Sequence, residues 1–353
     1  MKGTPPCIRI QNRLIGVESP PYIIAEMSAN HNGSLDRAFK ILQEAKAAGA
    51  DAVKIQSYTA DTITLDSNRE DFMIRGGLWD GRRLHDLYRE AEMPWEWHEP
   101  LFKCARELGI TLFSSPFDRS AVDLLESLDA PAYKIASFEV IDLPLIRYAA
   151  STGKPMIIST GMASRDEIDE AVDAARGAGC RELAVLRCVS GYPAPARDYD
   201  LRTLADMEQR YGLVTGLSDH TLDNTTAITS VALGASIIEK HFTLDRAGGG
   251  PDDSFSLEPG DLAALCSTAR LAWQALGQVR YGPAPSEQSN VKFRRSIYFV
   301  KDLAPGDVIT HDAIRVVRPG FGELPKHFDD LVGRRVNCAV ERNTPARLEQ
   351  LIP

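Results

Sequence analysis

The sequence lacks the marks of several protein classes. It has no CxxC pair and no low-complexity tract, and no apolar run approaches the ~18 residues of a membrane-spanning helix. The six cysteines are scattered, at Cys7, Cys104, Cys180, Cys188, Cys266 and Cys338. Such spacing predicts free thiols in a reducing compartment. The N-terminus also lacks a charged-then-apolar leader pattern, so we expect a cytoplasmic protein with no membrane partner.

An excess of positive charge is also missing. The 353 residues carry a formal net charge of −9, whereas nucleic-acid-binding surfaces are basic. We therefore expect no nucleic-acid partner, and an anionic substrate would need lysines or arginines gathered at one place. The hydrophobic fraction of 44% and the charged fraction of 25% are typical of a globular protein with a large core.

Apolar, β-prone segments alternate with helical ones through most of the chain. We predict strands at 22–25, 51–56, 110–113, 132–135, 156–158, 183–186, 213–217 and 236–238. Eight such strands separated by helices indicate an α/β fold, a TIM (β/α)8 barrel of ~250 residues. A short hairpin at 8–15 precedes them and is predicted to plug the bottom of the barrel.

The strand-then-helix alternation ends after a helix predicted at 262–276. The Gly-Pro-Ala-Pro-Ser stretch at 282–286 is typical of a linker, and short strands and turns follow it. We predict a barrel domain with the N-terminal hairpin at 1–282, a linker at 283–292 and a small β-rich domain at 293–353. The long connection at 57–93 is a candidate substrate lid, because long loops in compact domains are usually functional.

Two histidines follow neighbouring predicted strands near their carboxyl ends, His220 and His241. Strand ends of a parallel barrel open onto the catalytic face. Imidazole is the commonest side-chain ligand of transition metals, so the pair predicts a shared divalent cation. For either histidine alone, a local hydrogen bond would be the favoured interpretation; for the pair, a metal site is favoured.

Two lysines, Lys54 and Lys134, interrupt strands that are otherwise made of valine, isoleucine and alanine. A barrel strand has no solvent-facing side for them, so they predict a cationic pair for a phosphate or carboxylate. Ser115, Ser159 and Ser218 at other strand ends would complete an anion cradle.

Glu26 ends the first barrel strand after Tyr-Ile-Ile-Ala. That apolar setting would raise its pKa and make it a candidate acid or base, or else it pairs with Lys54. Together these residues indicate metal-assisted carbon–carbon bond formation with an anionic substrate. A Schiff-base aldolase using Lys54 or Lys134 fits nearly as well. A third hypothesis is that the barrel has no catalytic activity and that the C-terminal module is a carbohydrate-binding domain.

At these residues the sequence resembles the sialic acid synthase family, the nonulosonate synthases that condense phosphoenolpyruvate with an N-acetylated amino sugar. The resemblance covers essentially the whole chain. Its motifs are Ile24-Ala25-Glu26, Asn30-His31-Asn32-Gly33-Ser34, Val53-Lys54-Ile55-Gln56, Tyr133-Lys134-Ile135-Ala136-Ser137, Ser159-Thr160-Gly161-Met162, Gly216 to His220, Glu239 to Phe242, and Arg318-Pro319-Gly320. The resemblance implies a barrel followed by an antifreeze-like (SAF) domain, in a domain-swapped homodimer.

The resemblance also implies a role for each matching residue. His220 and His241 would hold Mn²⁺, with Mg²⁺ or Co²⁺ as alternatives, and Glu26 would position or activate water. Phosphoenolpyruvate would be bound by Lys54, Ser115, Lys134, Ser159 and Ser218. The sugar would be contacted by Gln56, Glu139, Tyr192, Asp252 and, from the partner's SAF domain, Arg318. Ser190 stands where sialic acid synthases carry asparagine, so no phosphate contact is assigned to it.

Within the family, the similarity is greatest to the branch that acts on a 6-deoxy-2,4-diacetamido altrose. The stretches that carry it are Glu70 to Ile74, Gly76 to Asp80, Trp95 to His98, Ser114 to Phe117, and Phe255 to Leu257. The alternative sugars are N-acetylmannosamine and the legionaminic acid precursor. A sugar without a C6 hydroxyl would prefer an apolar pocket wall, for which Phe72, Trp79 and Phe255 are candidates.

Overall fold

Eight parallel strands close into a barrel in which the last strand, β10, pairs with the first, β3. The structure is a computed structural model that describes residues 5–352. The barrel strands are β3 (Tyr22–Glu26), β4 (Ala52–Ser57), β5 (Thr111–Pro116), β6 (Tyr133–Ile135), β7 (Met156–Ser159), β8 (Leu183–Cys188), β9 (Val214–Asp219) and β10 (Ile237–His241). The TIM-barrel prediction is therefore confirmed.

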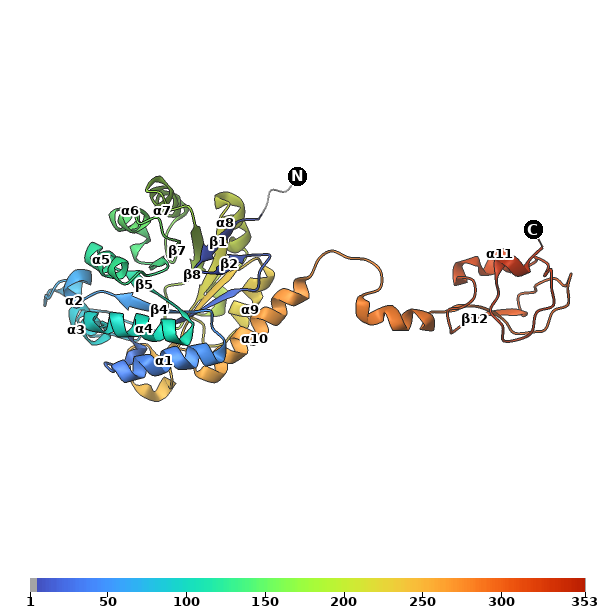
Figure 1. Ribbon diagram of the computed structural model, residues 1–353, viewed down its shortest axis with the longest axis horizontal. Coiled ribbons are helices and arrows are strands. Elements are labelled where there is room, and N and C mark those ends of the chain that lie inside the picture. The colour runs from blue at the N-terminus through green and yellow to red at the C-terminus, as the bar shows by residue number, and fades with distance from the viewer. Residues whose placement is uncertain (1–4, 353) are drawn as a thin grey trace. The chain divides into compact units, whose positions relative to one another are not determined.

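Helices surround the barrel strands (Figure 1). They are α1 (Leu35–Ala48), α2 (Ala60–Ile63), α3 (Leu84–Ala91), α4 (His98–Leu108), α5 (Arg119–Ser127), α6 (Leu143–Ala150), α7 (Arg165–Gly177), α8 (Thr203–Tyr211), α9 (Thr225–Ala232) and α10 (Pro259–Leu276). The two ends of α1 illustrate how the sequence determines where a helix begins and ends. Ser34 caps it by accepting a hydrogen bond from the Arg37 backbone, and Gly49 ends it with a φ of 91°. No helix within residues 5–352 is long and apolar enough to cross a membrane.

A hairpin closes one end of the barrel. It consists of β1 (Cys7–Ile10) and β2 (Arg13–Gly16), paired antiparallel. Its buried side chains Ile8, Ile10 and Ile15 share one core cluster with inward residues near the amino ends of the barrel strands. The predicted plug is therefore present, and it leaves the carboxyl ends of the strands as the open face.

The inward side chains change character along each strand. On β3 they are Tyr22 and Ile24 and then Glu26, and on β10 Ile237 is followed by Glu239. Successive inward positions on a strand are two residues apart. An apolar layer is therefore followed, two residues further along these strands, by a layer of ionisable groups.

The chain divides into two units after Gly277. In the second unit, β11 (Ser296–Phe299) pairs antiparallel with β12 (Ile314–Val317), and a small core forms around Ile297, Phe299 and Leu331. The unit also contains α11 (Phe328–Leu331) and the 3-10 helix η8 (Pro285–Phe293). Most of the linker predicted at 283–292 is helical, and Pro285 stands at the first position of that helix, where its missing N–H leaves no hydrogen bond unmade.

Candidate active site

Two lysines and two glutamates meet inside the barrel. Lys54 Nζ lies 2.7 Å from Glu26 Oε2 and 3.5 Å from Glu239 Oε1. Lys134 Nζ lies 3.5 Å from Glu239 Oε2, and Lys54 also donates to Ser115 Oγ at 3.2 Å. None of the four charged side chains is more than 6% exposed. Buried charges need partners of opposite sign, so each lysine here is held in place by a carboxylate.

Burial has the largest influence on the pKa of every group in this cluster. It raises the pKa of Glu26, with Glu239 adding to the rise and Lys54 opposing it. Burial alone would lower the pKa of Lys54, but Glu239 and Glu26 outweigh it and raise that pKa. Burial lowers the pKa of Lys134 against the attraction of Glu239. Glu26 is therefore suited to take up a proton, while Lys54 stays charged.

Three predicted serines lie on strands around this cluster. Ser115 accepts a hydrogen bond from Lys54, and Ser218 stands opposite Glu239 in the register of β9 and β10. Ser159 Oγ is buried and has no hydrogen-bond partner within the described part of the chain. A buried hydroxyl without a partner calls for an explanation, and a bound anion would supply one.

His220 and His241 lie side by side, with ring centroids 5.3 Å apart. His220 Nδ1 lies 2.7 Å from the Val189 carbonyl oxygen, which can only accept, so that nitrogen carries the proton and Nε2 keeps a lone pair. His241 Nδ1 is buried without a hydrogen-bond partner in residues 5–352, and Asp252 Oδ2 lies 3.9 Å from it. Burial lowers the pKa of His220 to about 4, and burial and His220 lower the pKa of His241 well below its usual range.

This pair fits a divalent cation. A metal binds the neutral form of imidazole, and both rings are neutral at pH 7 with a nitrogen free of hydrogen bonds to the chain. Across residues 5–352, no group of three or more His, Cys, Asp or Glu side chains is arranged to hold a metal ion. The chain would therefore supply two ligands and leave the other positions to substrate or water.

Three predicted sugar contacts lie next to these groups. Gln56 donates to Glu26 Oε1 at 2.8 Å, and Asp252 Oδ2 accepts from the Ala29 backbone at 3.3 Å. Glu139, in the 3-10 helix η4 (Glu139–Ile141), follows the strand that carries Lys134. Burial raises the pKa of Glu139 to about 7. Arg318 is exposed in the second unit, just after β12, and its sugar contact stays a prediction.

Aromatic rings extend from the two histidines. The Tyr192 ring lies 4.3 Å from His220, and the Phe255 ring lies 5.1 Å from His241. Trp79 lies further out, 5.9 Å from Tyr192 and 6.5 Å from Phe255. We call Trp79, Tyr192 and Phe255 the aromatic wall. It joins the long connection after β4 to the loops after β8 and β10.

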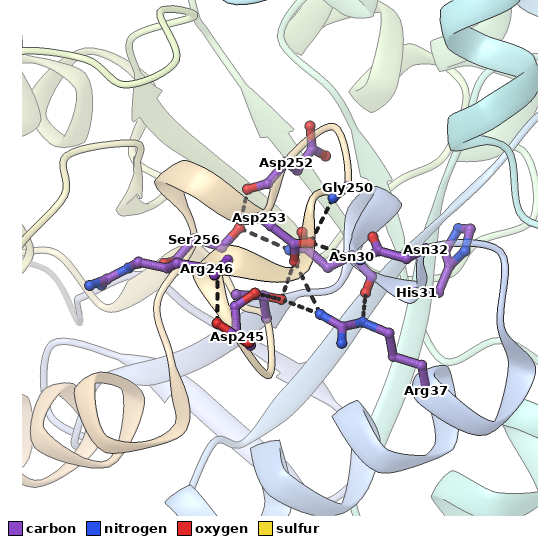
Figure 2. Close-up of polar contacts among 12 residues, drawn as sticks. Asn30, His31, Asn32, Arg37, Asp245, Arg246, Gly250, Asp252, Asp253 and Ser256 are labelled. Carbon is purple, nitrogen blue, oxygen red and sulfur yellow. Dashed lines mark hydrogen bonds and ion pairs between the residues drawn. The ribbon is translucent and has the colours of Figure 1, made fainter.

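The loop after β10 is fixed by Asp253 (Figure 2). Asp253 Oδ2 accepts from the Asn32 side chain at 2.7 Å and from the Gly250 backbone at 2.9 Å, and Oδ1 accepts from Arg37 at 3.2 Å. A Cβ at Gly250 would lie 1.9 Å from Asn32 Oδ1, so a larger residue there would push the Asn32 side chain from its place beside Asp253. The network fixes the chain on both sides of Asp253, including its neighbour Asp252.

Comparison with known proteins agrees with this geometry. Residues 41–281 match the NeuB family, and residues 294–352 match the SAF domain. The chain belongs to the NeuB family. Its relatives include pseudaminic acid synthases of Campylobacter jejuni, 41% identical over 91% of this chain and 93% of that one, and of Helicobacter pylori, 40% identical over 94% and 98%.

A solved member of similar fold is the N-acetylneuraminic acid (sialic acid) synthetase of Leptospira borgpetersenii in complex with citrate. It superposes with a TM-score of 0.72 at 32% identity, covering 81% of this chain and 95% of that chain. The family and the barrel-plus-SAF architecture predicted from the sequence are thus confirmed.

Glu239 of this NeuB-family chain had no role in the predictions, although it contacts both lysines. Strand alternation gives the missing signal, because Glu239 is two residues before His241 and shares its face. Lys240 points the other way, where its ammonium donates to the Thr221 and Asp223 carbonyl oxygens at 2.8 and 2.9 Å. Lys240 therefore fastens the loop after β9.

Proposed function

We propose that this chain is a pseudaminic acid synthase. It condenses phosphoenolpyruvate with 2,4-diacetamido-2,4,6-trideoxy-L-altrose and releases pseudaminic acid and phosphate. The observation that carries the proposal is the buried cluster of Lys54, Lys134, Glu26 and Glu239 beside two neutral histidines. It occurs in a chain 41% and 40% identical to two pseudaminic acid synthases over more than nine-tenths of its length.

Phosphoenolpyruvate binds through Lys54 and Lys134, with hydroxyl donors from Ser115, Ser159 and Ser218. Two features support this assignment: the lysines are the buried cations of the cluster, and the Ser159 hydroxyl has no hydrogen-bond partner among residues 5–352. The contacts of Glu239 with both lysines are 3.5 Å long, against 2.7 Å for Glu26 with Lys54. An incoming anion therefore displaces Glu239 more easily than Glu26.

A divalent cation, Mn²⁺ first and Mg²⁺ or Co²⁺ as alternatives, would be held by His220 and His241. When bound, it supplies Lewis acidity at the aldehyde oxygen of the open-chain sugar. The support is the neutral state of both rings, together with the buried Nδ1 of His241, which has no hydrogen-bond partner among residues 5–352.

In the reaction, the methylene carbon of phosphoenolpyruvate bonds to the sugar aldehyde carbon, and the new alkoxide takes up a proton. Water adds to C2 of phosphoenolpyruvate, where positive charge develops, and Glu26 accepts the proton of that water. The raised pKa of Glu26 suits this step. The tetrahedral centre then forms the keto group as its C–O bond to phosphate breaks, and its hydroxyl proton leaves with the phosphate. The proton that Glu26 accepted balances the one taken up by the alkoxide. Lys54 and Lys134 stabilise the anionic oxygens throughout.

Gln56, Glu139, Tyr192 and Asp252 contact the sugar in this proposal, and Arg318 of the partner subunit reaches its N-acyl group in a domain-swapped homodimer. Gln56 lies next to Glu26, and Tyr192 and Asp252 lie next to the histidines. For Glu139 the support is the charge of Lys134, which acts on the pKa of its carboxyl group. We also propose that the enzyme is cytoplasmic. All six cysteines, each within the described residues, are free thiols, as expected in a reducing compartment.

The direct test incubates the Mn²⁺-loaded protein with phosphoenolpyruvate and, in separate reactions, with the 6-deoxy altrose derivative, N-acetylmannosamine or the legionaminic acid precursor. Phosphate release and product mass are followed. Turnover with the altrose derivative alone is the expected result. Turnover with one of the other sugars instead would keep the reaction and contradict the assigned substrate.

The Schiff-base aldolase remains a second candidate because burial lowers the pKa of Lys134. A neutral amine is required to form an imine with a carbonyl substrate. Borohydride added during turnover separates the two functions. The synthase reaction leaves no substrate attached to the protein, whereas an aldolase would be trapped with added mass on Lys134 or Lys54.

A further inference from the structure

Trp79 sits at the tip of a short hairpin within the long connection between β4 and α3. The two sides of this hairpin meet at an antiparallel bridge between Met73 and Arg83. The Gly81 backbone donates to the Ile74 carbonyl oxygen at 2.9 Å. These bonds hold the turn that carries Trp79 without help from the side chain of its exposed neighbour, Leu78.

The hairpin tip is joined to the loop after β10 through Trp79. The indole Nε1–H donates to the Pro251 carbonyl oxygen at 3.2 Å. The ring also approaches Tyr192 and Phe255, the two members of the aromatic wall that contact the histidines. Trp79 therefore occupies the end of the wall remote from the histidines, where the end of the sugar remote from the aldehyde would lie.

The surface that Trp79 and Phe255 form at this end of the wall is apolar. The only polar group of the Trp79 side chain already donates to the backbone, and Phe255 has none. A sugar hydroxyl placed against these two rings would lose its water and gain no partner, which is unfavourable. A methyl group there would gain contact with the rings at no such cost.

We propose that Trp79 is a specificity-determining residue, against whose indole the C6 methyl group of a 6-deoxy amino sugar packs. This inference rests on the proposed function and adds the residue that selects the sugar. Trp79 contributes shape and apolar contact rather than a polar or covalent interaction with the reacting atoms. Phe72, also considered for the wall, lies half-buried in the 3-10 helix η2 (Glu70–Phe72), and its part in the wall stays a prediction.

The test compares two sugars that differ only at C6: 2,4-diacetamido-2,4,6-trideoxy-L-altrose and its 6-hydroxy analogue. We measure kcat/KM for both, and KM for phosphoenolpyruvate, in the wild type, Trp79→Ala, Trp79→Phe and Leu78→Ala. A hydrophobic pocket discriminates such pairs by about 10–100-fold, and we expect the wild type to prefer the 6-deoxy sugar by that factor. Leu78→Ala, next to Trp79 on the same turn, is the matched control.

Trp79→Ala should lower kcat/KM for the 6-deoxy sugar by about 10-fold or more and leave the 6-hydroxy analogue nearly unchanged, so that the preference collapses. The KM for phosphoenolpyruvate should not move. Trp79→Phe, which keeps a ring but loses the bond to Pro251, should retain most of the preference. Leu78→Ala should behave as the wild type.

Equal losses for both sugars in Trp79→Ala, or an unchanged preference, would overturn the role given to Trp79 while leaving the synthase proposal intact. A wild type that turns over neither sugar would instead overturn the proposed function, and the role of Trp79 would fall with it. If circular dichroism shows that Trp79→Ala is unfolded, kcat/KM for the two sugars is compared in Trp79→Phe and Trp79→Leu instead. Trp79→Leu, which loses the indole surface, should show a reduced preference, and full wild-type preference in that variant would overturn the role given to Trp79.

Discussion

The two ends of the barrel interior are built by the same strands but differ in chemistry. Toward the amino ends, inward positions form an apolar layer that includes Ala52, Phe113, Ala132, Ile157 and Ile237. Two residues further along the same strands, in the same order, the positions are Lys54, Ser115, Lys134, Ser159 and Glu239. The apolar layer packs against the hairpin, and the ionisable layer holds the candidate active site.

The difference shows how one fold divides stability from chemistry. The apolar layer keeps water away from the underside of the charged layer. Attraction between charges strengthens where water is excluded, so Glu26 and Glu239 hold the lysines firmly in position. Changes in the charged layer should therefore affect turnover most, whereas changes in the apolar layer should affect stability alone.

Lys54→Met should have the largest effect, because it leaves Glu26 and Glu239 with one buried lysine fewer. We expect turnover to fall by about 10³-fold and the free energy of unfolding to fall by about 3–5 kcal/mol. The matched control is Lys40→Met on α1, which removes an exposed pair with Glu44. It should cost less than about 1 kcal/mol. Similar losses in both variants, by urea unfolding, would contradict a special role for the buried cluster.

Ile10→Ala in the hairpin tests the opposite layer. Ile10 is fully buried, and its truncation leaves a cavity, so the free energy of unfolding should fall by about 2–4 kcal/mol. The kcat of the folded enzyme should stay at the wild-type value, measured below the onset of unfolding. A large drop in kcat with the fold intact would show that the two layers are not separable.

Glu139→Gln should change how stability depends on pH. Burial raises the pKa of Glu139 to about 7 in the folded protein, above its unfolded value. The folded state then binds more protons, so the wild type loses stability as the pH rises from about 4.5 through 7. The variant should lack this loss, worth about 1–3 kcal/mol. Urea unfolding at about pH 5 and pH 8 measures it, with exposed Glu349→Gln as the control; identical slopes in all three proteins would refute the shift.

Ser159→Ala should have the smallest effect on the free protein. Its hydroxyl has no hydrogen-bond partner among residues 5–352, so stability should hardly change. The dissociation constant for phosphoenolpyruvate should rise by about 10-fold, as for a lost hydrogen bond to a charged group. Titration calorimetry measures it. Unchanged affinity would remove Ser159 from the anion site.

Much of the barrel could be predicted from the sequence because strand periodicity is local. The hairpin, the eight strands and the pairing of His220 with His241 follow from apolar runs that end in polar residues. The contact of Lys54 with Glu26 was one of the two predictions made for Glu26, and the two residues lie opposite each other on the neighbouring strands β3 and β4.

Other features depend on contacts between distant segments. The Asp253 carboxylate joins Asn32 and Arg37, more than two hundred residues earlier in the chain, and no local pattern marks that pairing. The contacts of Glu239 with Lys54 and Lys134 could be predicted only by working out which residues of β10 point into the barrel. The bond from Trp79 to Pro251 likewise joins two loops whose approach only the folded chain defines.

The central claim is that the charged layer performs a synthase reaction on phosphoenolpyruvate with cleavage of its C–O bond. The most direct test supplies phosphoenolpyruvate carrying a heavy oxygen isotope at the bridging position between C2 and phosphorus, together with the 6-deoxy altrose derivative. The account predicts that the label leaves with phosphate and that a solvent oxygen appears in the sugar acid. Label retained in the sugar acid would show P–O cleavage and contradict it.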